Sequence, residues 1–229
     1  MIPTPAAVPT LDLAPGSERR VFAPFALAVP FLFLVPPLGL LLLGVGAFSA
    51  YFYRDPEREP AGEGVLAPAD GHVSVIREDG GRVRVGVFMS PFDVHVCRAP
   101  ADGDVTRLDH RGAAHRPAFA KESERNERFE YTLREDADRA DDATDDGADA
   151  GPDGDAGHVA GALIAGWFAR RITPYVSPGD SVSRCERIGY IAFGSRADVV
   201  LPAGYTVEDV RVSRGEAVRA GESVIARRD

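Results

Sequence analysis

The longest uncharged stretch of the chain runs from 21 to 53, and it constrains the fold more than any other feature. It holds 33 residues without a single Asp, Glu, Lys, Arg or His. A transmembrane helix needs about 20 apolar residues, so the run is too long for one straight span and somewhat short for two. Pro36-Pro37 divides it, because proline breaks the helical hydrogen-bond ladder. We expect a permanent membrane attachment, either a shallow helical hairpin or one tilted, kinked span.

The flanks of this run bear on its orientation. Basic residues stand on both sides, Arg19 and Arg20 before it and Arg54 and Arg58 after it. Charges on both flanks favour a hairpin with both ends in the cytoplasm. A cleaved signal peptide fits poorly, because the stretch is too long and no clear small-residue cleavage site follows it. We therefore expect the protein at the cell membrane, with its remaining residues on the cytoplasmic side.

The formal charge of -9 belongs to one segment. Residues 135–157 contain nine Asp and one Glu against Arg139, which leaves 25 acidic and 25 basic residues elsewhere. No dense basic stripe remains, so a nucleic-acid partner is not expected. The segment lacks apolar periodicity and is interpreted as a disordered surface insertion. Acid-rich inserts and a single lysine, Lys121, suit a salt-loving host.

The residues after Tyr53 have the pattern of an antiparallel β protein. Residues 82–89, RVRVGVFM, alternate Arg with Val, which is the period of a half-buried strand. Further strands are predicted at 72–76, 129–133, 159–165, 187–193 and 205–212. The one helix candidate is a short stretch around Lys121–Arg128. Cys97 and Cys185 follow no metal-ligand spacing, so neither a metal site nor a disulfide framework is predicted.

Two internal repeats indicate pseudo-symmetry. PADG at 68–71 recurs 32 positions later at 100–103, and PGDSV at 178–182 resembles RGEAV at 214–218. Each is a tight turn that leads into a strand. The pairing predicts a compact pseudo-symmetric β sandwich or barrel, similar to the biotinyl and lipoyl carrier folds. A carrier needs an exposed lysine at a hairpin tip, and Lys121 lies between neither pair of repeats, so the carrier chemistry is not expected.

The order of several motifs is more specific than any single residue. RDPER, APADGHV, FMSPFDVHVCRAP, FAKESERNER, AGWFARRI and RIGYIAFGSRADVVLP follow one another along the chain. This order resembles the short form of the phosphatidylserine decarboxylase proenzymes, from about Arg54 to the C-terminus. The resemblance implies an N-terminal tail (1–20), a membrane segment (21–53) and a catalytic β domain (54–229) with the insertion 135–157.

The resemblance also implies a self-processing enzyme. The serine of the FGS motif attacks the preceding glycine, which here places a cut between Gly194 and Ser195 and yields chains 1–194 and 195–229. Ser195 then becomes a covalent pyruvoyl group, an electron sink made from the chain itself. The implied substrate is a serine-headed phospholipid, either phosphatidylserine or the ether-linked archaetidylserine of a salt-loving archaeon. The implied partners are the membrane and a second copy in a homodimer.

The implied catalytic residues are Ser195, His95 and Asp70. Family members often carry two histidines three residues apart, and His95 matches the first while Arg98 replaces the second, which is the histidine of the family's Asp-His-Ser triad. We expect His95, oriented by Asp70, to act as the base for cleavage and later protonation.

The remaining expectations concern the substrate and a rival function. Arg171 and Arg196 lie in matched motifs, and an arginine fork suits phosphate or carboxylate, so they are the predicted substrate-binding residues. A rival interpretation is a membrane-tethered β-sandwich binding module without enzyme activity, which the replacement at Arg98 favours.

Overall fold

The structure, a computed structural model, describes residues 12–111, 127–134, 157–166, 172–192 and 195–228. These residues form two compact units, one ending at Glu57 and one beginning at Arg58.

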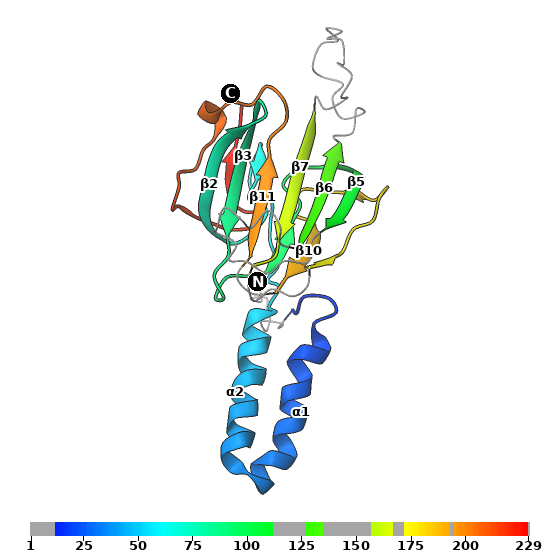
Figure 1. Ribbon diagram of the computed structural model, residues 1–229, viewed down its shortest axis with the longest axis vertical. Coiled ribbons are helices and arrows are strands. Elements are labelled where there is room, and N and C mark those ends of the chain that lie inside the picture. The colour runs from blue at the N-terminus through cyan, green and yellow to red at the C-terminus, as the bar shows by residue number, and fades with distance from the viewer. Residues whose placement is uncertain (1–11, 112–126, 135–156, 167–171, 193–194, 229) are drawn as a thin grey trace, which may run out of the picture. The chain divides into compact units, whose positions relative to one another are not determined.

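The first unit is a helical hairpin (Figure 1). Helix α1 covers Glu18–Leu34 and α2 covers Pro36–Phe52, so the break falls where the two prolines predict it. Proline is tolerated in the first turn of α2, where its missing N–H has no intrahelical acceptor. Two glycines of α2 allow close approach, because a Cβ added at Gly39 would lie 2.7 Å from the Cα of Leu32, and one at Gly46 would lie 2.9 Å from the Phe25 ring. Of the two forms expected from the sequence, the structure has the hairpin.

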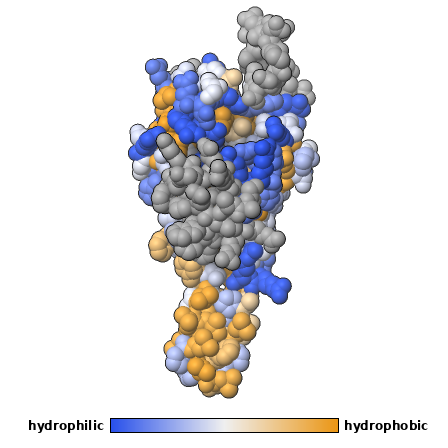
Figure 2. Space-filling view, viewed as in Figure 1, coloured by the Kyte–Doolittle hydropathy of each residue, from blue (hydrophilic) through white to orange (hydrophobic). Residues whose placement is uncertain are grey.

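The hairpin presents apolar side chains on its surface, and Figure 2 shows it largely in the hydrophobic colour. Phe33 is 86% exposed and Leu34 is 76% exposed, both at the end of α1 next to the turn. Within the described residues, neither helix combines the length and apolarity that a bilayer crossing requires. Membrane attachment of 21–53 stays a prediction.

The second unit is mainly β, as predicted. An eight-stranded sheet in the order β12-β2-β3-β11-β7-β6-β5-β9 curls into a half-barrel, and smaller sheets β4-β10-β8 and β1-β13 accompany it (Figure 1). The described strand pairs are antiparallel. The strands are β1 Val65–Leu66, β2 Gly71–Asp79, β3 Arg82–Phe88, β4 Val96–Arg98, β5 Gly103–Arg111, β6 Arg128–Arg134, β7 His158–Ile164, β8 Ile172–Pro174, β9 Ser181–Val182, β10 Arg187–Ile191, β11 Arg196–Val200, β12 Ala217–Val218 and β13 Val224–Ala226.

Alternation decides which face of each strand is buried. In β3, Val83, Val85 and Val87 enter the core, while Arg84 points to the opposite face. The strands predicted at 72–76, 82–89, 129–133 and 159–165 are confirmed, as is the described part of 187–193. The apolar core lies on the inner side of the curled sheet.

One local prediction was wrong, and another can be compared with the structure only at its end. Residues 205–212 contain a short 3₁₀ helix, Val207–Asp209, in place of a strand. Asp209 closes a capping box there, accepting hydrogen bonds from the Thr206 N–H (2.7 Å) and hydroxyl (3.0 Å), and this local bonding overrides the alternation. Arg128 begins β6 and does not end a helix. The rest of that predicted helix, with Lys121, lies outside the described residues.

The PADG repeats form a pseudo-symmetric pair. The N–H of Leu66 donates to the carbonyl of Pro100, and the N–H of Arg98 donates to the carbonyl of Pro68, each at 2.8 Å. The two donors are 32 positions apart and so are the two acceptors, so exchanging the two repeats converts one bond into the other. The same holds for the second repeat, because Val73 N–H binds Glu216 O (2.9 Å) as Val105 N–H binds Asp180 O (2.8 Å). The predicted pseudo-symmetry is therefore present in the hydrogen bonding.

The acidic insertion joins two strands that already pair with each other. β6 ends at Arg134, which is in register with His158 at the start of β7. Residues 135–156 lie outside the described part of the chain. Replacing 135–157 by a short Gly-Ser turn should leave the fold intact, because loop-closure cost changes by only about 0.6 kcal/mol per doubling of length.

We expect this deletion variant to unfold at the same temperature or slightly higher, as measured by circular dichroism. Its self-cleavage, followed on a gel, should match that of the full chain. Lost cleavage in a variant with an unchanged melting curve would assign the acidic residues a direct role.

Candidate active site

Ser195 lies at the head of the central strand of the curled sheet. It directly precedes β11, which pairs with β3 on one side and β7 on the other. Its side chain is fully buried, its carbonyl accepts the Met89 N–H (2.9 Å), and its hydroxyl lies 3.8 Å from the Met89 sulfur. The predicted nucleophile is thus held by rigid elements in a dry environment. Gly194 lies outside the described residues.

His95 is buried just before β4. It is 1% exposed, and its carbonyl accepts the N–H of Ile191 (3.2 Å). Its Nδ1 lies 2.9 Å from the carbonyl oxygen of Asp93. A carbonyl can only accept, so this contact places the proton of a neutral imidazole on Nδ1 and makes Nε2 the basic nitrogen. In this tautomer Nε2 can accept a proton, as a general base acting through that nitrogen must.

Asp93 is a residue that the sequence analysis missed. Its carboxylate accepts the N–H of Ser90 (2.7 Å) and closes the turn of the SPFD segment, from which its carbonyl reaches His95. The S-x-x-D spacing is a local turn signal and was available in the sequence. The Asp93 carbonyl therefore contributes a contact that orients the His95 ring.

Asp70 has other partners. Its Oδ1 accepts the N–H of Ala220 (2.9 Å), and its Oδ2 accepts from Arg58 (2.8 Å). Its repeat mate Asp102 accepts the N–H of Arg184 (3.0 Å) in the same way, so this backbone bond is turn chemistry common to both repeats. These contacts of the two carboxylate oxygens involve residues other than His95, and the orientation of His95 by Asp70 stays a prediction. A role of Asp70 in cleavage stays a prediction.

Asp70 nevertheless belongs to the same region as Ser195. The next residue, Gly71, has φ +140°, and a Cβ added there would lie 3.2 Å from the Cα of Met89, which binds Ser195. Only glycine permits this conformation and approach. The PADG turn also runs alongside β4, through the bonds between its residues and 98–100. Packing thus unites the PADG, FMSPFDVHV and FGSR motifs.

The thiol of Cys97 reports the polarity of this region. Burial raises its pKa well above the ordinary value, and the negative charge of Asp70 raises it further. Cys97 and Cys185 are both free and buried. Cys97 is therefore an inert, protonated core residue.

Of the two arginines predicted to bind substrate, the structure describes Arg196 only. Arg196 forms a fork with Asp198, at 2.7 Å from Nε and 3.0 Å from Nη2, and Asp198 is only 1% exposed. Those donors are committed to an internal ion pair, and Arg84 adds a longer contact to the same carboxylate (3.5 Å). Arg171 lies outside the described residues. Arg98 is buried and donates to the carbonyl of Cys185 (3.0 Å), which gives it a structural contact.

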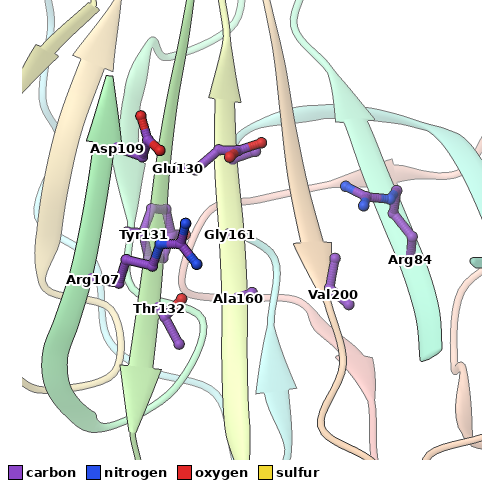
Figure 3. Close-up of a pocket in the computed structure, with 10 residues that line it drawn as sticks. Arg84, Arg107, Asp109, Glu130, Tyr131, Thr132, Ala160, Gly161 and Val200 are labelled. Atoms are coloured by element: carbon purple, nitrogen blue, oxygen red, sulfur yellow. The ribbon is translucent and has the colours of Figure 1, made fainter. Parts of the chain in front are cut away.

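A shallow hollow on the outer face of the sheet is separate from this site (Figure 3). Arg84 and Arg107 stand on opposite sides of a floor formed by small residues of β7. Apart from Tyr131, which belongs to the core, and Gly161, its lining residues alternate along their strands with core residues, so the hollow lies on the face of the sheet away from the core. The lining residues are Arg84, Arg107, Asp109, Glu130, Tyr131, Thr132, Ala160, Gly161, Ala162 and Val200.

Comparison with known proteins identifies the family to which these motifs belong. The profile of the phosphatidylserine decarboxylase family matches residues 45–226. A Halobacterium salinarum protein named as an archaetidylserine decarboxylase proenzyme is 45% identical over 95% of this chain and 100% of its own. A Thermobifida fusca protein named as a phosphatidylserine decarboxylase proenzyme is 42% identical over 83% of this chain and 78% of its own.

A Methanopyrus kandleri protein, again named for archaetidylserine decarboxylase, is 37% identical over 94% of this chain and 98% of its own. No solved structure matches the chain. The family match covers nearly all of the β unit and the end of the hairpin, and the two archaeal relatives match over more than nine-tenths of this chain. The chain belongs to the phosphatidylserine decarboxylase family.

Proposed function

We propose that the protein is a proenzyme that cuts itself between Gly194 and Ser195 and then decarboxylates a serine-headed phospholipid. The observation that carries the proposal is the buried Ser195 at the head of β11, in a chain of this family. Burial of the Ser195 hydroxyl fits a nucleophile, because an enclosed site keeps water from competing with it for the carbonyl.

The first step is an ester-forming rearrangement. His95 Nε2 takes the proton of the Ser195 hydroxyl, and the oxygen attacks the carbonyl carbon of Gly194. The peptide C–N bond breaks as the C–O bond forms, and His95 returns the proton to the departing nitrogen, which becomes the free amino group of residue 195. The Asp93 carbonyl supports this role by holding the proton of His95 on Nδ1.

The second step creates the pyruvoyl group. Loss of the Cα proton expels the Gly194 carboxylate and leaves dehydroalanine, and water then replaces its nitrogen, which departs as ammonia. The residues present fit such a group, because the residue-195 carbonyl already accepts the Met89 N–H. The group supplies a carbonyl that captures the substrate amine and takes up the electrons released with CO2.

The new N-terminus would remain in place after the cut. β11 lies between β3 and β7, β12 pairs with β2, and β13 pairs with β1, so segment 195–229 contributes three strands to sheets built by 1–194. Backbone bonds on both sides of β11 fix the position of residue 195. The chemistry after cleavage therefore needs no further assembly step.

We propose that the helical hairpin attaches the enzyme to the lipid surface on which its substrate lies. Support comes from the exposure of Phe33, Leu34 and further apolar side chains on both helices. Replacing Phe33 and Leu34 by Asp should release the protein from vesicles of serine phospholipid mixed with neutral phospholipid, because each buried aromatic or leucine side chain contributes about 1.5–3 kcal/mol.

Flotation of the vesicles measures the bound fraction, which should fall at least tenfold in the double variant (each 1.4 kcal/mol being about tenfold). Phe92→Asp is the control, since Phe92 is an exposed apolar residue of the β unit (67%) and should leave binding unchanged. Equal flotation of all three proteins would contradict attachment through the hairpin. The cytoplasmic orientation and a homodimer stay predictions.

The lipid tails are left to experiment, because the relatives are named for both archaetidylserine and phosphatidylserine substrates. We propose that the substrate has a serine headgroup and that its lipid part is that of either archaetidylserine or phosphatidylserine. Incubation of the cleaved enzyme with each lipid, with CO2 release as the readout, would separate the two.

Mass spectrometry of the purified protein tests the central proposal. We expect two chains that end at 194 and begin at 195, and the second should carry a pyruvoyl mass at its first residue. The rival, a membrane-tethered binding module, is favoured by Arg98 at the second-histidine position and predicts one uncut chain. A single intact mass near 24.5 kDa would support that rival.

A further inference from the structure

A buried ion network surrounds the candidate aspartate. The side chain of Arg58 is only 7% exposed, and its two terminal nitrogens each hold a carboxylate, Asp70 and Glu222, both at 2.8 Å. Removing an arginine from water is costly unless its charge is paired. The two carboxylates supply that pairing and hold the guanidinium of Arg58 in one orientation. Arg58 ends the RDPER motif, which the sequence analysis connected with membrane orientation and with the family but not with cleavage.

The duplicated turn supplies an internal comparison. Asp102 makes the same backbone bond as Asp70, yet its arginine partner, Arg184, is 3.5 Å away, and the side chains are 27% and 38% exposed. Arg184 comes from the paired turn itself, whereas Arg58 comes from a different segment. The PADG turn therefore forms without a tight buried ion pair. The ion pair between Arg58 and Asp70 is an additional interaction that the fold of the turn does not need.

Arg58 restricts the rotation of the Asp70 carboxylate, which is already held on one side by a backbone N–H. Ala220 N–H holds one oxygen and Arg58 holds the other. Gly71, next in the chain, packs against Met89, which binds Ser195 through its N–H. A shift of the carboxylate would thus be transmitted to the region of the scissile bond.

We propose that Arg58 is a positioning residue for self-cleavage, acting through Asp70. The inference rests on the proposed function. The network joins both sides of the cut, because Arg58 and Asp70 precede it, while Ala220 and Glu222 follow it. Arg58 can therefore hold the carboxylate in one geometry before and after processing.

The test compares two matched variants of the full chain, Arg58→Met and Arg184→Met. Each removes the arginine beside one PADG aspartate and keeps an unbranched apolar stem. Arg58→Met should cleave roughly 10- to 100-fold more slowly, the range expected for a small misplacement of a reacting group. Arg184→Met should cleave at the wild-type rate. Gel time courses measure both, and thermal melting reports stability.

A double substitution separates positioning from general destabilisation. If Arg58 acts through Asp70, adding Arg58→Met to Asp70→Asn should slow cleavage no further than Asp70→Asn alone. Arg58→Lys, which keeps a cation beside Asp70, should recover part of the rate. Glu222→Gln leaves the Arg58–Asp70 pair in place and should lower the cleavage rate only a few-fold. This variant still tests the network if Arg58→Met folds poorly.

Wild-type cleavage by Arg58→Met, or equal slowing in Arg184→Met, would overturn the inference. So would an additive loss in the double variant, because a purely structural contribution does not depend on the charge of Asp70. The proposed function is judged separately, by the pyruvoyl mass on the wild-type protein, so either idea can fail while the other stands.

Discussion

Ser195→Ala is expected to remain a single uncut chain of about 24.5 kDa, without decarboxylase activity. Alanine has no oxygen to attack Gly194, and without the ester no route leads to dehydroalanine or to the pyruvoyl group. The fold should be unaffected, because the change removes one oxygen from a fully buried site, where the hydroxyl lies 3.8 Å from the Met89 sulfur. Intact-mass measurement after prolonged incubation checks the outcome.

Two further serine variants sharpen this result. Ser181→Ala, at an exposed position in β9, should mature normally and serves as the control. Ser195→Cys restores a nucleophile of similar size and should recover some cleavage, since a thiol can form the equivalent thioester. Normal processing of Ser195→Ala would end the pyruvoyl proposal.

His95→Ala is expected to slow self-cleavage by about 10²- to 10⁴-fold, the usual contribution of a general base. Maturation, which we expect to be complete in the wild-type protein, should become a slow process on a gel time course. His110→Ala is the matched control, because His110 is nearly half exposed and pairs with Glu127 at 2.9 Å. Circular dichroism would verify that the buried substitution leaves the fold intact.

The aspartate variants complete the test of the base. Asp70→Asn should impair cleavage less than His95→Ala, because His95 is oriented by the Asp93 carbonyl. Asp102→Asn makes the same change in the duplicate turn and should have no effect on the cut. If His95→Ala matures at the normal rate while His110→Ala or Arg98→Ala does not, the base lies elsewhere. Arg98→Ala should instead lower stability, since its buried side chain donates to the Cys185 carbonyl.

Local patterns in the sequence determined much of this protein. The alternation in 82–89 specified β3 and its buried face, because side chains of a strand alternate between two faces. Pro36-Pro37 located the break between the helices, because proline cannot continue the hydrogen-bond ladder. The PADG repeats predicted the pseudo-symmetry, and the ordered motifs indicated the family. Each of these signals is contained in neighbouring residues or in their order.

Only the tertiary structure decided which groups meet. Asp70 bonds Arg58 and Ala220, and Ala220 is 150 positions away in the chain. The fork of Arg196, predicted to hold substrate, is closed by Asp198 and approached by Arg84 from a neighbouring strand. The tautomer of His95 follows from a backbone carbonyl, which every residue possesses and no sequence pattern marks. Partners of this kind are set by strand register and packing, because a hydrogen bond depends on positions in space, which residue types alone do not specify.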